Sequence, residues 1–96
     1  MNDIKLVSNH KRQLKPLVEA ALANELRLLE AGIRQAEERI HKFEKKYKMI
    51  TREFISRYES DEMEETMDFA EWIGESRVLE RLREKAETLR DIRFAN

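Results

Sequence analysis

Apolar residues recur along the first half of the chain at alternating spacings of four and three residues. The stripe consists of Leu22, Leu26, Leu29, Ile33, Ala36, Ile40, Phe43, Tyr47 and Ile50. This alternation is the heptad pattern of a coiled-coil seam, and it predicts one long helix over residues 15–49, with Pro16 in its first turn. A rod about 50 Å long cannot bury such a stripe alone, so the helix must pack against another helix.

A short second helix is predicted after a break near residues 48–50. Thr51 is a suitable N-cap, and the helix is expected over residues 51–60. Its narrow apolar face contains Phe54, Ile55 and Tyr58. Ser60 and the acidic residue that follows it mark the next break.

A third helix is predicted over residues 66–93, with Thr66 or Asp68 as its N-cap. Its apolar positions are Phe69, Trp72, Ile73, Leu79, Leu82, Ala86, Leu89 and Ile92. The later spacings match those of the first stripe. The fold class is therefore all-α: a long antiparallel helical hairpin, coiled-coil-like, with a short connecting helix at the bend.

The 96 residues form a single helical domain, in which residues 1–14 can be flexible. Within that segment Ile4 and Leu6 allow a short strand, while Ser8 and Asn9 could instead cap an early helical turn. Charged residues make up 41% of the chain, with only two glycines and one proline, a composition that favours long, solvated helices.

Acid–base pairs four residues apart are expected to support the first helix. They are Glu30 with Arg34, Glu38 with Lys42 and Glu44 with Lys48. A hairpin of this size buries little surface per residue, so a homodimer or a hetero-complex is expected. The seam of that oligomer is expected at Leu22, Leu26, Leu29, Ile33, Ile40 and Phe43.

The net charge of −1 conceals an uneven distribution along the chain. Residues 1–50 carry a net charge of +4, and residues 51–96 carry −5. Between Glu59 and Glu75 there are eight acidic residues and no basic one. A nucleic-acid-binding protein usually shows a basic stripe, so nucleic acid is not expected as a partner of the chain alone, and a basic protein is the better candidate.

No set of residues indicates catalysis, a metal ion or a cofactor. Glu38 and His41 match the Glu-x-x-His element of di-iron bundles, but the element occurs once, and both residues are expected to point outward. His10 lies in a basic cluster, which is more typical of a solvated chain terminus than of an anion-binding site. The chain has no cysteine and no phosphate loop or nucleophile elbow. We therefore expect that the protein is not an enzyme and that it binds no cofactor.

Apolar and aromatic residues are interleaved with the acidic segment. Met63, Met67, Phe69 and Trp72 lie among its carboxylates. Apolar anchors inside a surface of one charge are what a protein-binding patch requires, because the anchors supply affinity and the charges supply selectivity. The residues expected to contact a partner are Glu62, Glu64, Glu65, Asp68, Glu71 and Trp72. The alternative for Phe69 and Trp72 is a place in the core beneath the bend.

Residues 43–72 contain a motif in which aromatic residues flank the acidic segment. It consists of Lys46-Tyr47-x-Met49, then Phe54, an acidic stretch, and Asp68-x-x-Glu71-Trp72. This motif resembles a group of short helical prokaryotic proteins regarded as the antitoxin halves of toxin–antitoxin pairs. Members of that group commonly have glycine after the tyrosine and in the acidic turn, where this chain has Lys48 and Ser60.

The resemblance implies a non-catalytic inhibitor of a small basic toxin, with the acidic-aromatic residues covering the positive site of that toxin. The alternative is a self-associating structural coiled coil without a dedicated ligand. No apolar run reaches the roughly 20 residues of a membrane span, and residues 1–7 contain no signal-peptide core, so a cytoplasmic location is expected.

Overall fold

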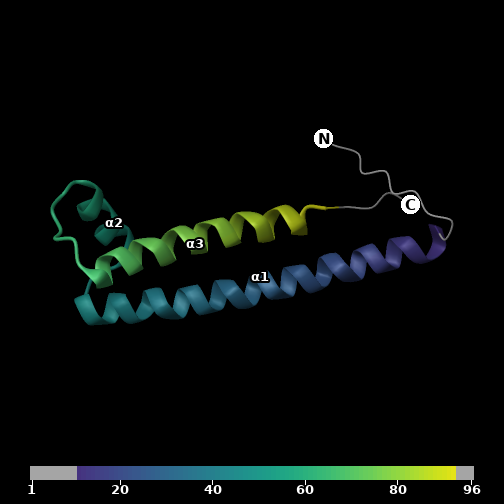
Figure 1. Ribbon diagram of the computed structural model, residues 1–96, viewed down its shortest axis with the longest axis horizontal. Helices are drawn as coiled ribbons and strands as arrows, with labels where there is room; N and C mark the ends of the chain where they lie inside the picture. Colours follow the sequence, from purple (N-terminus) through teal and green to yellow (C-terminus); the bar gives the residue numbers. More distant parts are fainter. Residues whose placement is uncertain (1–10, 93–96) are drawn as a thin grey trace.

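The computed structural model describes residues 11–92, which form three helices (Figure 1). Helix α1 spans Lys11–Tyr47, α2 spans Thr51–Glu59 and α3 spans Met67–Arg90. The two long helices α1 and α3 lie side by side and antiparallel, and α2 sits at the bend that joins them. The predicted all-α helical hairpin is confirmed. The expectations for Ile4, Leu6, Ser8, Asn9 and His10 concern residues outside the described range.

The start of α1 differs from the prediction. The helix begins at Lys11, four residues before the predicted start, and Pro16 therefore lies inside it rather than in its first turn. A proline at this position removes the intrahelical hydrogen bond to the carbonyl of Arg12, and its ring crowds that carbonyl. That loss does not stop the preceding turn from being helical.

Both helix ends at the bend are closed by a residue in the left-handed conformation. Lys48 has φ 51° and Asp61 has φ 57°. Beyond each of them an amide donates back across the last turn, from Met49 to the Glu44 carbonyl (3.2 Å) and from Glu62 to the Arg57 carbonyl (2.9 Å). These are the bonds of a Schellman motif, in which glycine is the usual left-handed residue. The motifs explain why α1 and α2 stop at the predicted breaks.

The apolar stripe of α1 faces α3. Leu29 and Ile40 are buried, while Ile33 and Phe43 are partly buried and pack against the core cluster. Leu22 and Leu26 are half-buried beside Leu89 and Ile92 near the open end of the hairpin. The residues expected to form an oligomer seam therefore lie within the hairpin, because α3 supplies the apolar surface that a second chain was expected to supply.

Small residues allow the two long helices to approach closely. Ala36 and Ala86 have no exposed surface. A methyl group placed on Gly32 would lie 3.2 Å from the Cδ1 atom of Leu82. The small side chains thus lie where the opposite helix leaves little room.

Ion pairs across the hairpin hold α1 and α3 in register. Two acidic residues on α1 pair with arginines on α3, Glu30 with Arg90 (3.0 Å) and Glu37 with Arg83 (2.7 Å). On the other edge of the seam the signs are exchanged, because Arg39 pairs with Glu75 (3.2 Å) and Lys46 with Asp68 (2.6 Å). In each set the two α1 residues are seven positions apart, and so are their two partners on α3. Both pairs of a set can form together only in this antiparallel alignment of the helices.

The acid–base pairs expected within the first helix are wrong for the described residues. Glu30 pairs across the hairpin rather than with Arg34, and Glu44 bonds to Thr51 and His41 rather than to Lys48. No ion pair joins Glu38 to Lys42 in this part of the chain. For Glu30 and Glu44 the packing of the other helices supplies partners, Arg90 on α3 and Thr51 on α2.

Candidate functional site

The bend encloses a core of aromatic side chains from all three helices. Trp72 of α3 and Phe54 of α2 are fully buried and stack face to face, with ring centroids 3.9 Å apart. Phe43 and Tyr47 of α1 stack on the indole of Trp72 at 5.6 Å and 5.9 Å, and Phe69 lies against Phe54 at 5.3 Å. Contacts of this kind fasten α2 to the hairpin.

The sequence predicts Trp72 as a partner contact, and the structure shows that this prediction is wrong. Its side chain has no exposed surface, so in this fold it cannot touch a partner. Phe69 is buried as well, at 8% exposure. The sequence allowed both a partner contact and a core position for Phe69 and Trp72. The packing of α2 against α1 and α3 buries both side chains in the core.

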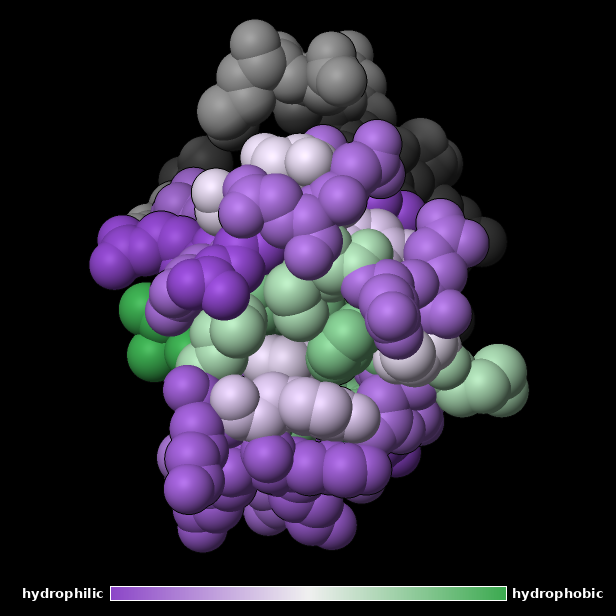
Figure 2. Space-filling model, turned by 90° about the vertical axis from the view of Figure 1, so that its left-hand side faces the viewer, coloured by the Kyte–Doolittle hydropathy of each residue, from purple (hydrophilic) through white to green (hydrophobic). Residues whose placement is uncertain are grey.

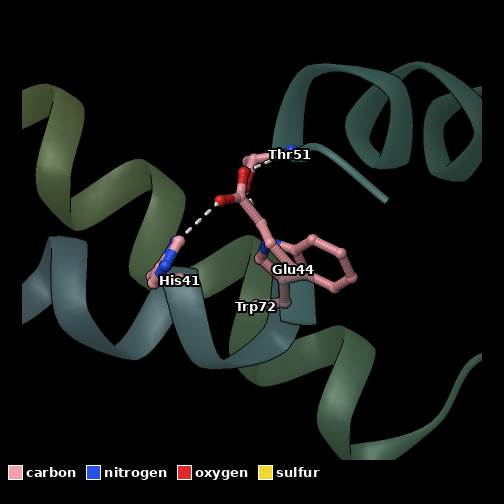
Figure 3. Close-up of polar contacts among 4 residues, drawn as sticks. All are labelled: His41, Glu44, Thr51 and Trp72. Carbon is pink, nitrogen blue, oxygen red and sulfur yellow. Dashed lines mark hydrogen bonds and ion pairs between the residues drawn. The ribbon is translucent and has the colours of Figure 1, made fainter. Parts of the chain in front are cut away.

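A polar cluster borders the aromatic core (Figure 3). The amide N–H and the hydroxyl of Thr51 both donate to Oε2 of Glu44, each at 2.8 Å. The indole N–H of Trp72 donates to the Thr51 hydroxyl at 3.0 Å, and His41 lies 3.5 Å from the second oxygen of Glu44. The Thr51 hydroxyl is therefore engaged both as donor and as acceptor, and these bonds attach the start of α2 to α1.

The N-cap predicted for α2 is wrong. Thr51 is the first residue of α2, and Ile50 occupies the N-cap position without a side-chain bond. The carboxylate of Glu44, seven residues earlier on α1, bonds to the Thr51 amide instead. For α3 the prediction is confirmed, because the Thr66 side chain accepts from the Phe69 amide at 3.1 Å.

Glu44 has a lowered pKa in this setting. Burial by itself raises the pKa of the carboxyl group, but the hydrogen bonds from the Thr51 amide, the Thr51 hydroxyl and His41 outweigh that effect. Because the pKa lies below that of the unfolded chain, the ionised carboxylate stabilises the fold at neutral pH. The contribution is lost as the pH falls through the lowered pKa.

We expect the Glu44→Gln substitution to reduce the free energy of unfolding at pH 7 by about 1–2 kcal/mol, because it removes a charged acceptor from the start of α2. As the pH falls through the lowered pKa of Glu44, the difference from the unsubstituted chain should shrink, since Glu44 then becomes protonated in the folded as well as in the unfolded state. Urea unfolding across this pH range measures both effects. Glu38→Gln, at an exposed position of the same helix, serves as the control and should change little. A loss that stays constant as the pH is lowered from 7 until Glu44 is protonated in the folded state would contradict the role given to the Glu44 charge.

Asp68 also belongs to the hairpin rather than to a free surface. Its carboxylate accepts from Lys46 Nζ at 2.6 Å and from the Tyr47 hydroxyl. The hydrogen bond from Lys46, followed by the one from Tyr47, holds the pKa of Asp68 below its usual range. The same bonds to Asp68 raise the pKa of Lys46 and of Tyr47. Asp68 thus already has a basic partner within the chain.

The remaining predicted contact residues are exposed. Glu62, Glu64 and Glu65 lie in the loop between α2 and α3, and Glu71 lies on the first turns of α3. Within residues 11–92 none of these four carboxylates forms an ion pair. We call these four residues the acidic loop surface.

Apolar side chains gather at the same end of the molecule. Figure 2 looks onto the bend and shows hydrophobic atoms in the centre of this face, bordered above and below by hydrophilic ones. Of the apolar residues in the two connecting loops and at the start of α3, Met67 is 88% exposed and Ile50 is 56% exposed. Met49 and Met63 are partly buried and pack on the core. The acidic loop surface therefore adjoins exposed apolar side chains.

A groove of about 760 Å³ runs between the three helices on the side where α2 packs. Its apolar floor is formed by Ile40, Ile55 and Leu79. Glu80, Glu84 and Glu87 lie along its α3 wall. The sequence did not indicate this groove, because it depends on how far α2 extends over the hairpin. The only sign of it in the sequence is the spacing of Glu80, Glu84 and Glu87, which places the three acids on one face of α3.

The chain matches no known protein family, and no curated protein or solved structure matches it either. In the part of the chain that the structure describes, no group of three or more potential ligands is placed to hold a metal ion. None of the helices in that part has the length and apolar character needed to cross a bilayer.

Proposed function

We propose that this protein is a non-catalytic protein-interaction module that neutralises a small basic protein, as antitoxins do, through the acidic loop surface at its bend. The observation that supports the proposal is the set of exposed carboxylates of Glu62, Glu64, Glu65 and Glu71, which have no ion pair within the described residues. The segment around them contains no basic residue between Glu59 and Glu75. A cationic surface is the complement of such a patch.

The apolar residues beside the acids suit the same role. Among the large apolar side chains that the structure describes, Met67 is the most exposed, and methionine adapts its shape to different partner surfaces. Its exposure would be reduced on binding, and this burial supplies affinity that charge alone does not. The stacking of Phe54 on Trp72 fixes α2 against α3, and thus both helices between which the acidic loop runs, which limits the ordering cost of binding.

The test uses the product of an adjacent gene if that product is a small basic protein. Mixed with this chain, it should form a stable complex whose affinity falls as salt is raised, because exposed charge pairs are screened. Replacing Glu62, Glu64 and Glu65 together with lysine should weaken the complex by at least about a hundredfold, since attraction becomes repulsion. Isothermal titration measures the affinity, and circular dichroism verifies that helix content is unchanged.

The matched control changes the net charge by the same amount elsewhere. Glu25, Glu38 and Glu80 are exposed and lie on the long helices. Their replacement with lysine should reduce affinity only slightly, through the long-range field. Equal losses in both triple variants would mean that net charge rather than the acidic loop surface decides binding. No complex with a basic neighbour at low salt would refute the proposal.

A further inference from the structure

The groove between the three helices is a surface separate from the acidic loop surface. On α3 its lining runs from Ser76, near the bend, to Glu87, further along the hairpin. At about 1.5 Å per residue this stretch is about 16 Å long, or about three helical turns. The described lining includes none of the four residues of the acidic loop surface. We call this feature the acidic groove.

Helix α2 closes the groove only at the bend. Its first turns contribute Thr51 and Ile55 to the lining, and Thr51 lies beside Glu44 of α1 there (Figure 3). Further along the hairpin, no third helix of the described chain continues over Ile40 and Leu79, which keep 7% and 8% exposure in the lining. A helix laid in the groove would extend the three-helix packing that α2 begins at the bend.

Negative charge predominates in the groove. Its lining contains five glutamates, two arginines and one histidine. One of the arginines, Arg83, is already neutralised by Glu37 at 2.7 Å. Three exposed glutamates of α3 form no ion pair within residues 11–92, namely Glu80, Glu84 and Glu87. One wall therefore carries unmatched negative charge above an apolar floor.

The three unmatched acids form a row. They are spaced four and three residues apart, so they follow one face of α3 and lie about one helical turn from each other. The row is about 10 Å long, which a single small cation cannot span. Lysine or arginine residues spaced four and three apart along a second helix have the same periodicity and can meet all three acids.

We propose that the acidic groove is the docking site for a basic amphipathic helix of a partner protein. The apolar side of that helix packs on Ile40, Ile55 and Leu79, as amphipathic helices do in apolar grooves. Lysine or arginine residues along its flank pair with the acids of the α3 wall. Charge complementarity selects this occupant, because an acidic helix would be repelled and an uncharged one would leave the acids unmatched. The inference does not depend on the proposed function, since the two surfaces share no residue.

The probe is a fluorescently labelled synthetic peptide of about 14 residues, long enough to follow the groove as a helix. It has leucine on one face and lysine, spaced four and three residues apart, beside that face. Fluorescence anisotropy should give a dissociation constant of about 10–100 µM at low salt, rising as salt is added. The same peptide with glutamate in place of lysine, and a scrambled peptide of the same composition, should bind at least about tenfold more weakly. No binding of the lysine peptide up to about 1 mM, or equal binding of the three peptides, would overturn the proposal.

A charge reversal on the α3 wall tests the row of acids. The double variant Glu84→Lys/Glu87→Lys should raise the dissociation constant of the lysine peptide at least about tenfold. Helix content should be unchanged, because both positions are exposed. Glu25→Lys/Glu38→Lys is the matched control, since both residues are exposed on α1 outside the groove and the net charge changes equally. Its effect should be at most about twofold. Equal losses in the two double variants would overturn the proposal.

The position of the bound peptide distinguishes the groove from the acidic loop surface. In ¹⁵N-labelled protein the amide signals of Ile40, Ile55 and Leu79 should shift when the lysine peptide is added, and those of Glu64 and Glu65 should not. Shifts confined to the loop would overturn the docking site in the groove and would leave the proposed function intact. A loss of binding by the basic neighbour would refute the proposed function and would leave the groove unaffected.

Discussion

Replacing Trp72 with alanine should lower the free energy of unfolding by about 3–5 kcal/mol, the range found for large aromatic side chains removed from cores. The side chain is fully buried and stacks on Phe54, Phe43 and Tyr47. Its loss therefore leaves a cavity that all three helices border. Because small elongated domains have little stability to lose, we expect the variant to be largely unfolded at 37 °C. Circular dichroism during urea unfolding measures the change.

The Trp72→Phe variant separates packing from hydrogen bonding. It keeps an aromatic ring but removes the indole N–H that donates to the Thr51 hydroxyl. The expected loss is smaller, about 1–2 kcal/mol, from the lost bond and the smaller ring. A change of less than about 1 kcal/mol in the alanine variant would show that the aromatic core does not hold the bend together.

Replacing Ala36 with leucine should destabilise the hairpin by about 1–3 kcal/mol, even though leucine is a good helix former. Ala36 has no exposed surface and belongs to the core cluster, so three added carbon atoms find no free space. The helices must separate or the neighbouring side chains must leave their preferred rotamers. The same unfolding measurement gives the size of this effect.

Ala20→Leu is the matched control for this overpacking. Ala20 lies on the same helix and is exposed, so the substitution alters helix propensity by the same amount without crowding a neighbour. We expect a change within about 0.5 kcal/mol. Equal stability of the two variants would mean that α1 and α3 are not closely packed at Ala36.

Several features of the fold could be predicted because their signals are local. The heptad spacing of the first stripe predicts a helix that needs a helical partner, and Thr66 caps α3 through a bond three residues away. The breaks near Lys48 and Ser60 were also predicted, although the left-handed residues that close them were not. In each of these cases the deciding interactions lie within one or two turns of the residue concerned.

The candidate site was predicted less completely. The exposed acids of the loop are among those that the sequence singled out, because carboxylates without a basic neighbour have no reason to be buried. The sequence also predicts Asp68 as a charge and Trp72 as an apolar anchor of the same surface. The fold removes both from the exposed set, since Asp68 pairs with Lys46 and Trp72 stacks on Phe54.

By itself the sequence determined that the chain forms long amphipathic helices, where they break, and that the acidic charge is concentrated at the bend. The tertiary structure alone decided that Glu44 bonds to the first amide of α2 and that Trp72 is buried. The physical reason is the sequence distance between the residues that interact. Helix formation and the Thr66 cap depend on neighbours within a few residues, whereas burial and the bond between Glu44 and Thr51 depend on how separate helices pack.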